Sequence, residues 1–380
     1  MNIGFDAKRA YHNGTGLGHY SRTLINSMAK YFPQDEYYLF NPKPSSKFTI
    51  NKVNNVHEIL PSGILSKLFP SAWRSSWVKK DLKKYKIDIY HGLSHEIPAG
   101  IQNTNIKSAV TIHDLIHERF PEQYNPIDVK IYHKKFSYAC KIADKIIAIS
   151  NQTKEDIIEF YKAPKEKITV CYQSCNPLFA KEVTEKEKEY IKKKYELPGK
   201  YFLYVGTIIE RKNLLSICKA LVWTKDVINI PLVVIGDGGK YKQQVKDYVL
   251  KNNLEKRMIF LSEHPNADES FTSAKDFPAI YQSAMALIYP SMFEGFGIPV
   301  LEALFSKLPV ITSNISSLPE AGGDAALYIN PASHEEIAEA MKRIFYDEPL
   351  REIMKQKGWQ HAQKFTEEKC AASVMDVYKS

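Results

Sequence analysis

Cysteine is scarce in this sequence. Five cysteines occur among 380 residues, and only Cys171 and Cys175 lie close together. An isolated C-x3-C without a second pair does not by itself indicate zinc. The number and scatter of the cysteines exclude a disulfide-stapled scaffold, so we expect buried, reduced thiols.

Long apolar runs are also lacking. No stretch of 18 or more consecutive apolar residues occurs, so the sequence predicts no membrane-spanning helix. The first residues, MNIGFDAKRA, place an acid at Asp6 before an apolar segment could form, so we expect no signal peptide. We therefore expect a cytoplasmic protein, and we leave open a peripheral attachment to the inner face of the plasma membrane.

Acidic residues are outnumbered in one half only. Residues 1–178 hold 25 Lys and Arg against 16 Asp and Glu, whereas residues 179–380 hold 27 of each. A basic half favours an anionic partner, such as nucleic acid, a phospholipid surface or a phosphorylated substrate. A solvated, lysine-rich surface without a partner explains the same excess.

Short apolar runs alternate with longer amphipathic segments. The runs predict buried strands at 3–5, 87–90, 109–112, 145–149, 168–172, 201–205, 232–235, 258–261, 286–289 and 310–312. This alternation predicts an α/β fold with parallel sheets, which bind ligands at the carboxyl ends of their strands. The length favours two domains, and Asn176-Pro177-Leu178 predicts the boundary between them.

A glycine-bearing turn follows one of the predicted strands of the second half. Gly295 and Gly297 permit close approach of the backbone, and Pro299 suits the first turn of a helix. The amides and positive dipole end of such a helix predict a diphosphate site. Glu294 lies just before this helix and Glu302 about two turns along it. A carboxylate beside a diphosphate is unfavourable unless it binds hydroxyls, so the pattern indicates a ligand with both a diphosphate and sugar hydroxyls.

The pattern E-G-F-G-x-P-x-L-E-A, from Glu294 to Ala303, resembles the E-x7-E signature of family 4 of the retaining glycosyltransferases. Other segments resemble features of that family in the same order: Gly14–Gly18, Thr111–Asp114, Val205–Leu214 and Val233–Gly239. The resemblance spans nearly the whole chain. It implies the GT-B fold, in which two doubly wound Rossmann-like domains face a central cleft. The acceptor-binding domain would be 1–178 and the donor-binding domain 179–364.

The resemblance also implies roles for individual residues. His113 and Glu294 would act on the transferred sugar, and Glu302 would bind the ribose hydroxyls of the donor. The other implied donor-binding residues are Gly16, Gly18, Arg211, Lys212, Gly295, Phe296, Gly297 and Ile298. Many relatives carry an arginine where this chain has Thr207, so the diphosphate would depend on Arg211, Lys212 and backbone amides. A purely structural histidine at His113 is the alternative, as it is at His91.

The sequence contains no D-x-D motif, so we expect no aspartate-held metal and no cofactor beyond the nucleotide sugar. The resemblance implies transfer of a hexose with retention of configuration. Mannose from GDP-mannose is the favoured donor, and a lipid-linked bacterial surface glycan, as in lipopolysaccharide, is the favoured acceptor. A related GT-B epimerase or phosphorylase, or a non-enzymatic nucleotide-sugar binding protein, is an alternative. Nucleic acid is not an expected partner, because no recognised binding module is present.

Two further segments carry expectations of their own. Leu65–Lys86 contains Trp73 and Trp77 one turn apart, followed by five lysines, which is typical of an interfacial helix on an anionic membrane. A core helix with Trp73, Trp77 and Leu82 facing inward explains the same spacing. Residues 365–380 form an amphipathic helical pattern whose apolar stripe must be buried, and we expect this helix to cross back onto the first domain. The stripe consists of Cys370, Val374, Val377 and Tyr378.

Overall fold

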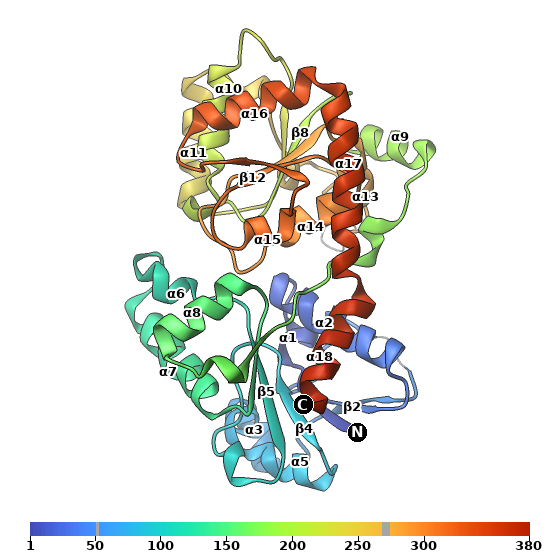
Figure 1. Ribbon diagram of the computed structural model, residues 1–380, viewed down its shortest axis with the longest axis vertical. Helices are drawn as coiled ribbons and strands as arrows, with labels where there is room; N and C mark the ends of the chain where they lie inside the picture. The colour runs from blue at the N-terminus through green and yellow to red at the C-terminus, as the bar shows by residue number, and fades with distance from the viewer. Residues whose placement is uncertain (51–52, 268–273) are drawn as a thin grey trace. The chain divides into compact units, whose positions relative to one another are not determined.

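The computed structural model describes residues 1–50, 53–267 and 274–380. The chain forms two compact units (Figure 1). The first comprises Met1–Cys175 together with Phe365–Ser380, and the second comprises Asn176–Lys364. The chain therefore leaves the first unit, builds the second, and returns with its last helix. The predicted boundary lay after residue 178, a few residues beyond Cys175.

A parallel sheet lies at the centre of the first unit. Among the described residues it has seven strands in the order β3-β2-β1-β4-β5-β6-β7. The strands are β1 (Asn2–Asp6), β2 (Glu36–Phe40), β3 (Val56–Ile59), β4 (Ile89–Gly92), β5 (Lys107–Ile112), β6 (Lys145–Ala148) and β7 (Ile168–Val170). The helices are α1 (Lys8–His12), α2 (Gly16–Tyr31), α3 (Ile64–Leu68), α4 (Pro70–Ala72), the π-helical turn η1 (Trp73–Trp77), α5 (Lys79–Lys84), α6 (Ile116–Arg119), α7 (Pro126–Ile142), α8 (Asn151–Tyr161) and α18 (Glu367–Lys379). The strand order reverses between β1 and β4, which is where such sheets bind ligands.

The second unit repeats the architecture. Its described residues form a six-stranded parallel sheet in the order β10-β9-β8-β11-β12-β13. The strands are β8 (Phe202–Val205), β9 (Leu232–Ile235), β10 (Met258–Phe260), β11 (Ala286–Tyr289), β12 (Val310–Ser313) and β13 (Ala326–Ile329). The helices are α9 (Glu185–Lys194), α10 (Leu214–Trp223), α11 (Lys240–Lys251), α13 (Phe277–Ser283), α14 (Ile298–Phe305), α15 (Leu318–Gly322), α16 (His334–Tyr346) and α17 (Glu348–Ala362). The strand order reverses between β8 and β11, so the loops after these two strands meet at one edge of the sheet.

Short 3-10 turns connect many of these elements. They are η2 (Ile101–Asn103), η3 (Pro121–Gln123), η4 (Lys165–Lys167), η5 (Pro177–Ala180), η6 (Glu210–Lys212), η7 (Glu255–Arg257), η8 (Leu261–Glu263) and η9 (Gln363–Phe365). The prediction of two doubly wound α/β domains is confirmed.

The sequence prediction missed three strands, which are β2, β3 and β13. β3 and β13 lie at sheet edges, where few of their residues are fully buried, so they lack the continuous apolar run of a central strand. β2 begins with a glutamate, which shortens its apolar run, although the tyrosines, leucine and phenylalanine that follow favour a strand.

Helix α18 packs in the core of the first unit. It begins after Thr366, whose hydroxyl accepts from the backbone amide of Lys369. All four residues of the predicted stripe are buried, and Figure 1 shows the red α18 beside the blue α2. At the end of the helix, the Tyr378 hydroxyl contacts His91 Nδ1 at 2.5 Å, while His91 Nε2 contacts the Thr111 hydroxyl at 2.7 Å. A buried polar network thus joins α18 to β4 and β5. His91 therefore has a structural role, as the sequence analysis allowed.

The segment around the two tryptophans is divided into short elements instead of one helix. Trp73 is buried and donates its indole N–H to Asp81, and Leu82 is also buried. Trp77 is 39% exposed. The core interpretation is therefore right for Trp73 and Leu82 and wrong for Trp77. All five cysteines are buried and none forms a disulfide, as the sequence suggested.

Candidate functional site

Two glycines bring the loops after β8 and β9 into contact. Gly206 and Gly236 both have positive φ angles, of 148° and 154°. A Cβ atom added to Gly236 would lie 1.9 Å from the carbonyl oxygen of Gly206, so only glycine fits there. Both loops leave the carboxyl edge of the sheet, where the resemblance placed the donor diphosphate.

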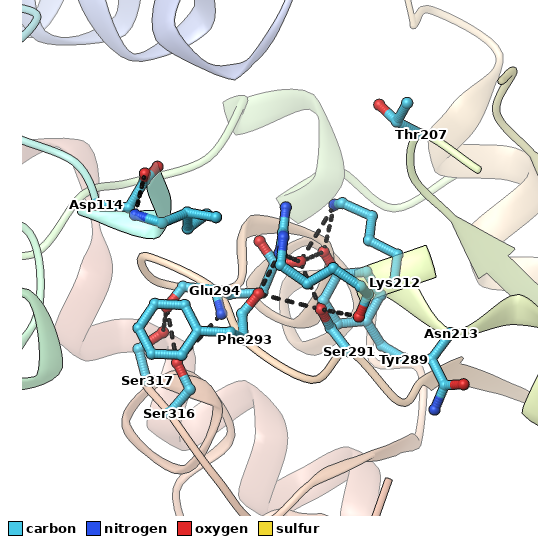
Figure 2. A network of polar contacts seen from close by, with 12 residues as sticks. Asp114, Thr207, Lys212, Asn213, Tyr289, Ser291, Phe293, Glu294, Ser316 and Ser317 are labelled. Carbon is cyan, nitrogen blue, oxygen red and sulfur yellow. Dashed lines mark hydrogen bonds and ion pairs between the residues drawn. The ribbon is translucent and has the colours of Figure 1, made fainter. Parts of the chain in front are cut away.

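Glu294 is the centre of a polar network in the second unit (Figure 2). Its Oε1 atom accepts hydrogen bonds from the hydroxyls of Tyr289 and Ser291, both at 2.8 Å. The same oxygen lies 3.0 Å from Arg211 Nη1 and 3.4 Å from Lys212 Nζ. Within the described part of the chain, no hydrogen-bond partner lies on Oε2. One carboxylate oxygen is thus held by four groups, and the other is available to a ligand.

The charge of Glu294 is fixed by its neighbours. Burial would raise the pKa of this carboxyl, but Lys212, Arg211 and the two hydroxyls lower it to about 2. The side chains of Arg211, Lys212 and Glu294 are only 9%, 14% and 13% exposed. The predicted pair of diphosphate-binding cations therefore also neutralises the predicted catalytic carboxylate.

Hydrogen bonds connect the loop after β8 to the loop after β11. The Arg211 guanidinium donates to the carbonyl of Phe293, and the Arg211 carbonyl accepts from the amide of Met292. Lys212 Nζ donates to the Tyr289 hydroxyl at 2.7 Å. These contacts fix the two predicted donor-binding segments relative to each other.

Serines that follow β12 hold the backbone of the E-G-F-G turn. Ser317 Oγ donates to the carbonyls of Glu294 and Phe296, at 2.8 and 2.9 Å. Ser316 Oγ contacts both the amide and the carbonyl of Glu294. Ser316 itself has a φ of 60°, a costly conformation for a residue other than glycine. Neither serine is part of a motif that could be recognised from the sequence.

The helix after the turn, α14, carries Glu302. Gly297 precedes it with a φ of 118°, and a Cβ there would lie 2.9 Å from Leu318. Glu302 Oε2 accepts a hydrogen bond of 2.8 Å from the Tyr281 hydroxyl of α13. Burial raises the pKa of Glu302 to about 7, against the opposing effects of that hydrogen bond and of Lys212. The two glutamates of the motif therefore differ in protonation: Glu294 is fully ionised near neutral pH and Glu302 is half-protonated.

His113 lies in the first unit, directly after β5. Its Nε2 atom is 2.9 Å from the carbonyl oxygen of Leu93, and a carbonyl can only accept, so Nε2 carries the proton. The ring meets Tyr20 of α2 edge to face, with centroids 4.6 Å apart. Burial lowers the pKa of His113 to about 4, so the ring is neutral at pH 7 and its Nδ1 atom is an acceptor.

The two predicted glycines of the first loop differ in their surroundings. A Cβ on Gly18 would lie 1.8 Å from the carbonyl oxygen of Asn13, whereas a Cβ on Gly16 would meet nothing within 4 Å. The Asn13 side chain accepts from the amides of Thr15 and Gly18, which closes the loop onto the start of α2. Gly18 is thus required by the local fold, and Gly16 is not.

The structure brings some of the predicted residues of the second unit together and separates another from them. In the second unit, Arg211, Lys212 and Glu294 form one network, and Glu302 forms a separate pair with Tyr281. Thr207 is exposed, and Figure 2 shows no contact between it and the network. Sequence reasoning missed the hydroxyls of Tyr281, Tyr289 and Ser291, because a tyrosine or serine at a strand end has no distinctive spacing.

Among residues 1–50, 53–267 and 274–380, no three His, Cys, Asp or Glu side chains are arranged to hold a metal ion. No helix there is long and apolar enough to cross a bilayer.

Two family models match the chain, one on each unit. The model described as "Glycosyltransferase Family 4" matches residues 15–177, and "Glycosyl transferases group 1" matches residues 185–361. Together with the two doubly wound sheets, these matches show that the chain belongs to family 4 of the glycosyltransferases and has the GT-B fold. The chain is a glycosyltransferase.

Two of the individual relatives that match this chain are mannosyltransferases. The chain is 28% identical over 397 aligned positions to O-antigen chain mannosyltransferase B of Escherichia coli, with all of both chains covered. It is 31% identical over 240 positions to O-antigen chain mannosyltransferase RfbU of Salmonella typhimurium, covering 62% of this chain and 60% of that protein. Sucrose-phosphate synthase from Thermosynechococcus elongatus has a similar structure, with a TM-score of 0.76, 19% identity, and 100% and 98% of the two chains covered. This structural similarity shows that the two chains share a fold, and it shows nothing more.

Proposed function

We propose that this protein is a metal-independent, retaining mannosyltransferase that uses GDP-mannose and extends a lipid-linked bacterial surface glycan. The observation that carries the sugar assignment is the full-length similarity to an O-antigen chain mannosyltransferase. In this proposal, unit two binds the donor and unit one binds the acceptor in the cytoplasm, at the inner face of the plasma membrane.

The network around Glu294 supports its proposed role. Because Oε1 is fully used by Tyr289, Ser291 and the two cations, the carboxylate cannot rotate freely, and Oε2 has a fixed direction. A carboxylate whose pKa is about 2 stays ionised throughout turnover, so it accepts hydrogen bonds from sugar hydroxyls and stabilises positive charge at the anomeric carbon.

In the proposed reaction, the acceptor hydroxyl attacks the anomeric carbon from the side that the diphosphate leaves. The bond from that carbon to the phosphate oxygen breaks, and the acceptor proton passes to a diphosphate oxygen. Arg211, Lys212 and the amino end of α14 would neutralise the charge that develops on the leaving diphosphate. No divalent cation and no side-chain base takes part in this scheme. Neutral His113 would hydrogen-bond the transferred sugar, with the C6 hydroxyl as its partner.

A thermal-shift panel with GDP, UDP, dTDP and ADP tests the donor assignment. A ligand at 100 times its Kd stabilises a protein by about 2.7 kcal/mol, so the preferred base should stand out clearly. GDP should give the largest shift. Incubation with GDP-mannose and a lipid-linked saccharide should then yield an α-linked product by NMR. A larger shift with UDP, or a β-linked product, would contradict the proposal.

A further inference from the structure

Exposed apolar side chains gather at one place on the first unit. Ile64, Leu65, Leu68 and Phe69 are 80%, 64%, 67% and 56% exposed, and α3 buries none of its residues. Leu60 and Trp77 nearby are also exposed, at 38% and 39%. We call these six residues the α3 patch. Single exposed apolar residues need no explanation, but a contiguous group marks an interaction surface.

The α3 patch is not a core element that has lost its partner. The core positions of this region are filled by Trp73, Val78 and Leu82, which are 1%, 1% and 0% exposed. α3 contacts α4 and η1. The apolar side chains therefore face outward from a fully packed region.

Basic side chains lie on α3 and on the segment that follows η1. Lys67 lies on α3 itself, and the exposed lysines that follow η1 are Lys80, Lys83, Lys84 and Lys86. In the described part of the chain none of them forms an ion pair. The nearby Asp81 is occupied by the Trp73 indole, and Arg74 is turned inward to Asp6 and Glu96. This surface thus combines the exposed apolar residues of α3 with the lysines of α3 and of the segment that follows η1.

We propose that the α3 patch and its lysines dock on an anionic phospholipid surface, with Ile64, Leu65, Leu68 and Phe69 inserted at the headgroup boundary. Apolar residues beside lysines are the pattern of interfacial elements, and each lysine near an anionic surface strengthens binding about fivefold. Lysine is depleted in protein–protein interfaces, whereas arginine is enriched. The five exposed cations here are all lysines, which favours lipid over a protein partner.

The place of the patch suits an enzyme with a lipid-linked acceptor. Arg74 of η1 pairs with Asp6, at the carboxyl end of β1, and with Glu96 in the loop after β4. α3 packs against η1, so the apolar side chains are tied through Arg74 to the carboxyl end of β1. The lysines at the end of α5 lie toward the amino end of that strand, where the Asn2 side chain donates to the carbonyls of Tyr85 and Lys86. Figure 1 shows α3 and α5 at the same end of the first unit. The inference deepens the proposed function, and it rests on that function only for the link to a lipid-linked acceptor.

Cosedimentation of the full-length protein with vesicles tests this surface. The wild type should bind vesicles of phosphatidylglycerol and phosphatidylcholine in equal parts, and should bind pure phosphatidylcholine at least about tenfold more weakly. The double variant Leu65→Gln/Leu68→Gln should lose at least about tenfold of the binding to anionic vesicles, since it removes two of the inserted side chains. The charge variant Lys83→Gln/Lys84→Gln should lose about 25-fold at most, because two lysines are removed.

Leu250→Gln is the matched control. Leu250 is 66% exposed, like Leu68 at 67%, but it lies on α11 of the second unit. The control should bind vesicles as the wild type does. Thermal melting should show that both leucine variants are folded, because the replaced side chains are exposed.

Three outcomes would overturn the inference. The first is binding to anionic vesicles that Leu65→Gln/Leu68→Gln leaves unchanged, and the second is no binding by the wild type. The third is sedimentation of the wild type as a dimer that Leu65→Gln/Leu68→Gln dissociates, which would assign the patch to a second copy of the chain. GDP binding by the same variants separates this inference from the proposed function, since the donor site should be unaffected.

Discussion

The raised pKa of Glu302 makes stability depend on pH, and Glu302→Gln should remove that dependence. In the folded chain the pKa is about 7, because burial disfavours the charged form, whereas the ordinary value is 4.5. Between these two pH values the folded state holds a proton that the unfolded state has lost. The contribution of Glu302 to the free energy of unfolding is therefore fully present below about pH 4.5, and it declines as the pH rises to 7.

The size of this pH effect on stability follows from the pKa shift of Glu302. One pKa unit corresponds to about 1.4 kcal/mol, so the ionised, buried carboxylate costs at most about 3 kcal/mol at pH 8 and under about 1 kcal/mol at pH 5. Glutamine keeps an oxygen that accepts from the Tyr281 hydroxyl and carries no charge. Glu302→Gln should therefore raise the melting temperature of the second unit by several degrees at pH 8 and by little at pH 5, since about 2–4 °C corresponds to 1 kcal/mol in a unit of this size.

Differential scanning calorimetry of the unliganded full-length protein at both pH values measures the effect. Glu339→Gln is the control, because Glu339 lies on the surface of α16 with 62% of its side chain exposed. That variant should respond equally at pH 5 and pH 8. An equal response of Glu302→Gln at the two pH values would refute the burial argument, as would a lower melting temperature at pH 8.

Four other predictions follow from the site and the fold. Glu294→Gln should lower kcat about 10–100-fold, because it weakens the charged hydrogen bond that we propose to the reacting sugar, and it should change the Kd of GDP little. Initial rates measure kcat and titration calorimetry measures the Kd, and an unchanged kcat would contradict the proposed role. Sugar transfer should persist in EDTA, and complete loss that magnesium restores would contradict the metal-free scheme. Gly18→Ala should lower the melting temperature while Gly16→Ala leaves it unchanged, since only the first meets a backbone oxygen at 1.8 Å; equal effects would contradict the contact. Tyr378→Phe should destabilise the first unit by about 1–3 kcal/mol, because His91 loses a buried partner, and an unaltered calorimetric transition would refute that assignment.

The central strands and the helix pattern were predictable from the sequence because apolar periodicity reports burial. The four strands that flank the two switch points, β1, β4, β8 and β11, were all predicted within two residues at each end. Two edge strands, β3 and β13, escaped prediction because few of their residues are fully buried, whereas the edge strands β7 and β10 kept enough of an apolar run to be predicted. The boundaries of the short helices around Trp77 could not be predicted either, because a π-helical turn at Trp73–Trp77 interrupts the helix. Helical spacing left both a core and an interfacial position open for Trp77, which is exposed.

The site was predictable in its charged members and not in its neutral ones. Glu294, Arg211 and Lys212 were identified through a spacing that is specific to a family. The hydroxyls of Tyr289 and Ser291 hold Oε1 of Glu294 and add to the lowering of its pKa by Lys212 and Arg211, and their positions follow from tertiary contacts. No local pattern encodes which hydroxyl meets which carboxylate, so the protonation states of the two glutamates could only come from the structure.

The return of α18 to the first unit has a consequence for how the protein is made. About 190 residues separate β7 from α18, and a ribosome adds about 5–20 residues per second, so α18 is synthesised roughly 10–40 s after the sheet that it covers. During that interval Tyr20, Leu24 and Met28 of α2 lack the apolar partners that α18 provides. The second unit, in contrast, is continuous in sequence and is complete when Lys364 has been added. The first unit therefore depends on a segment that is made long after its sheet, and it is the unit that needs protection while it waits.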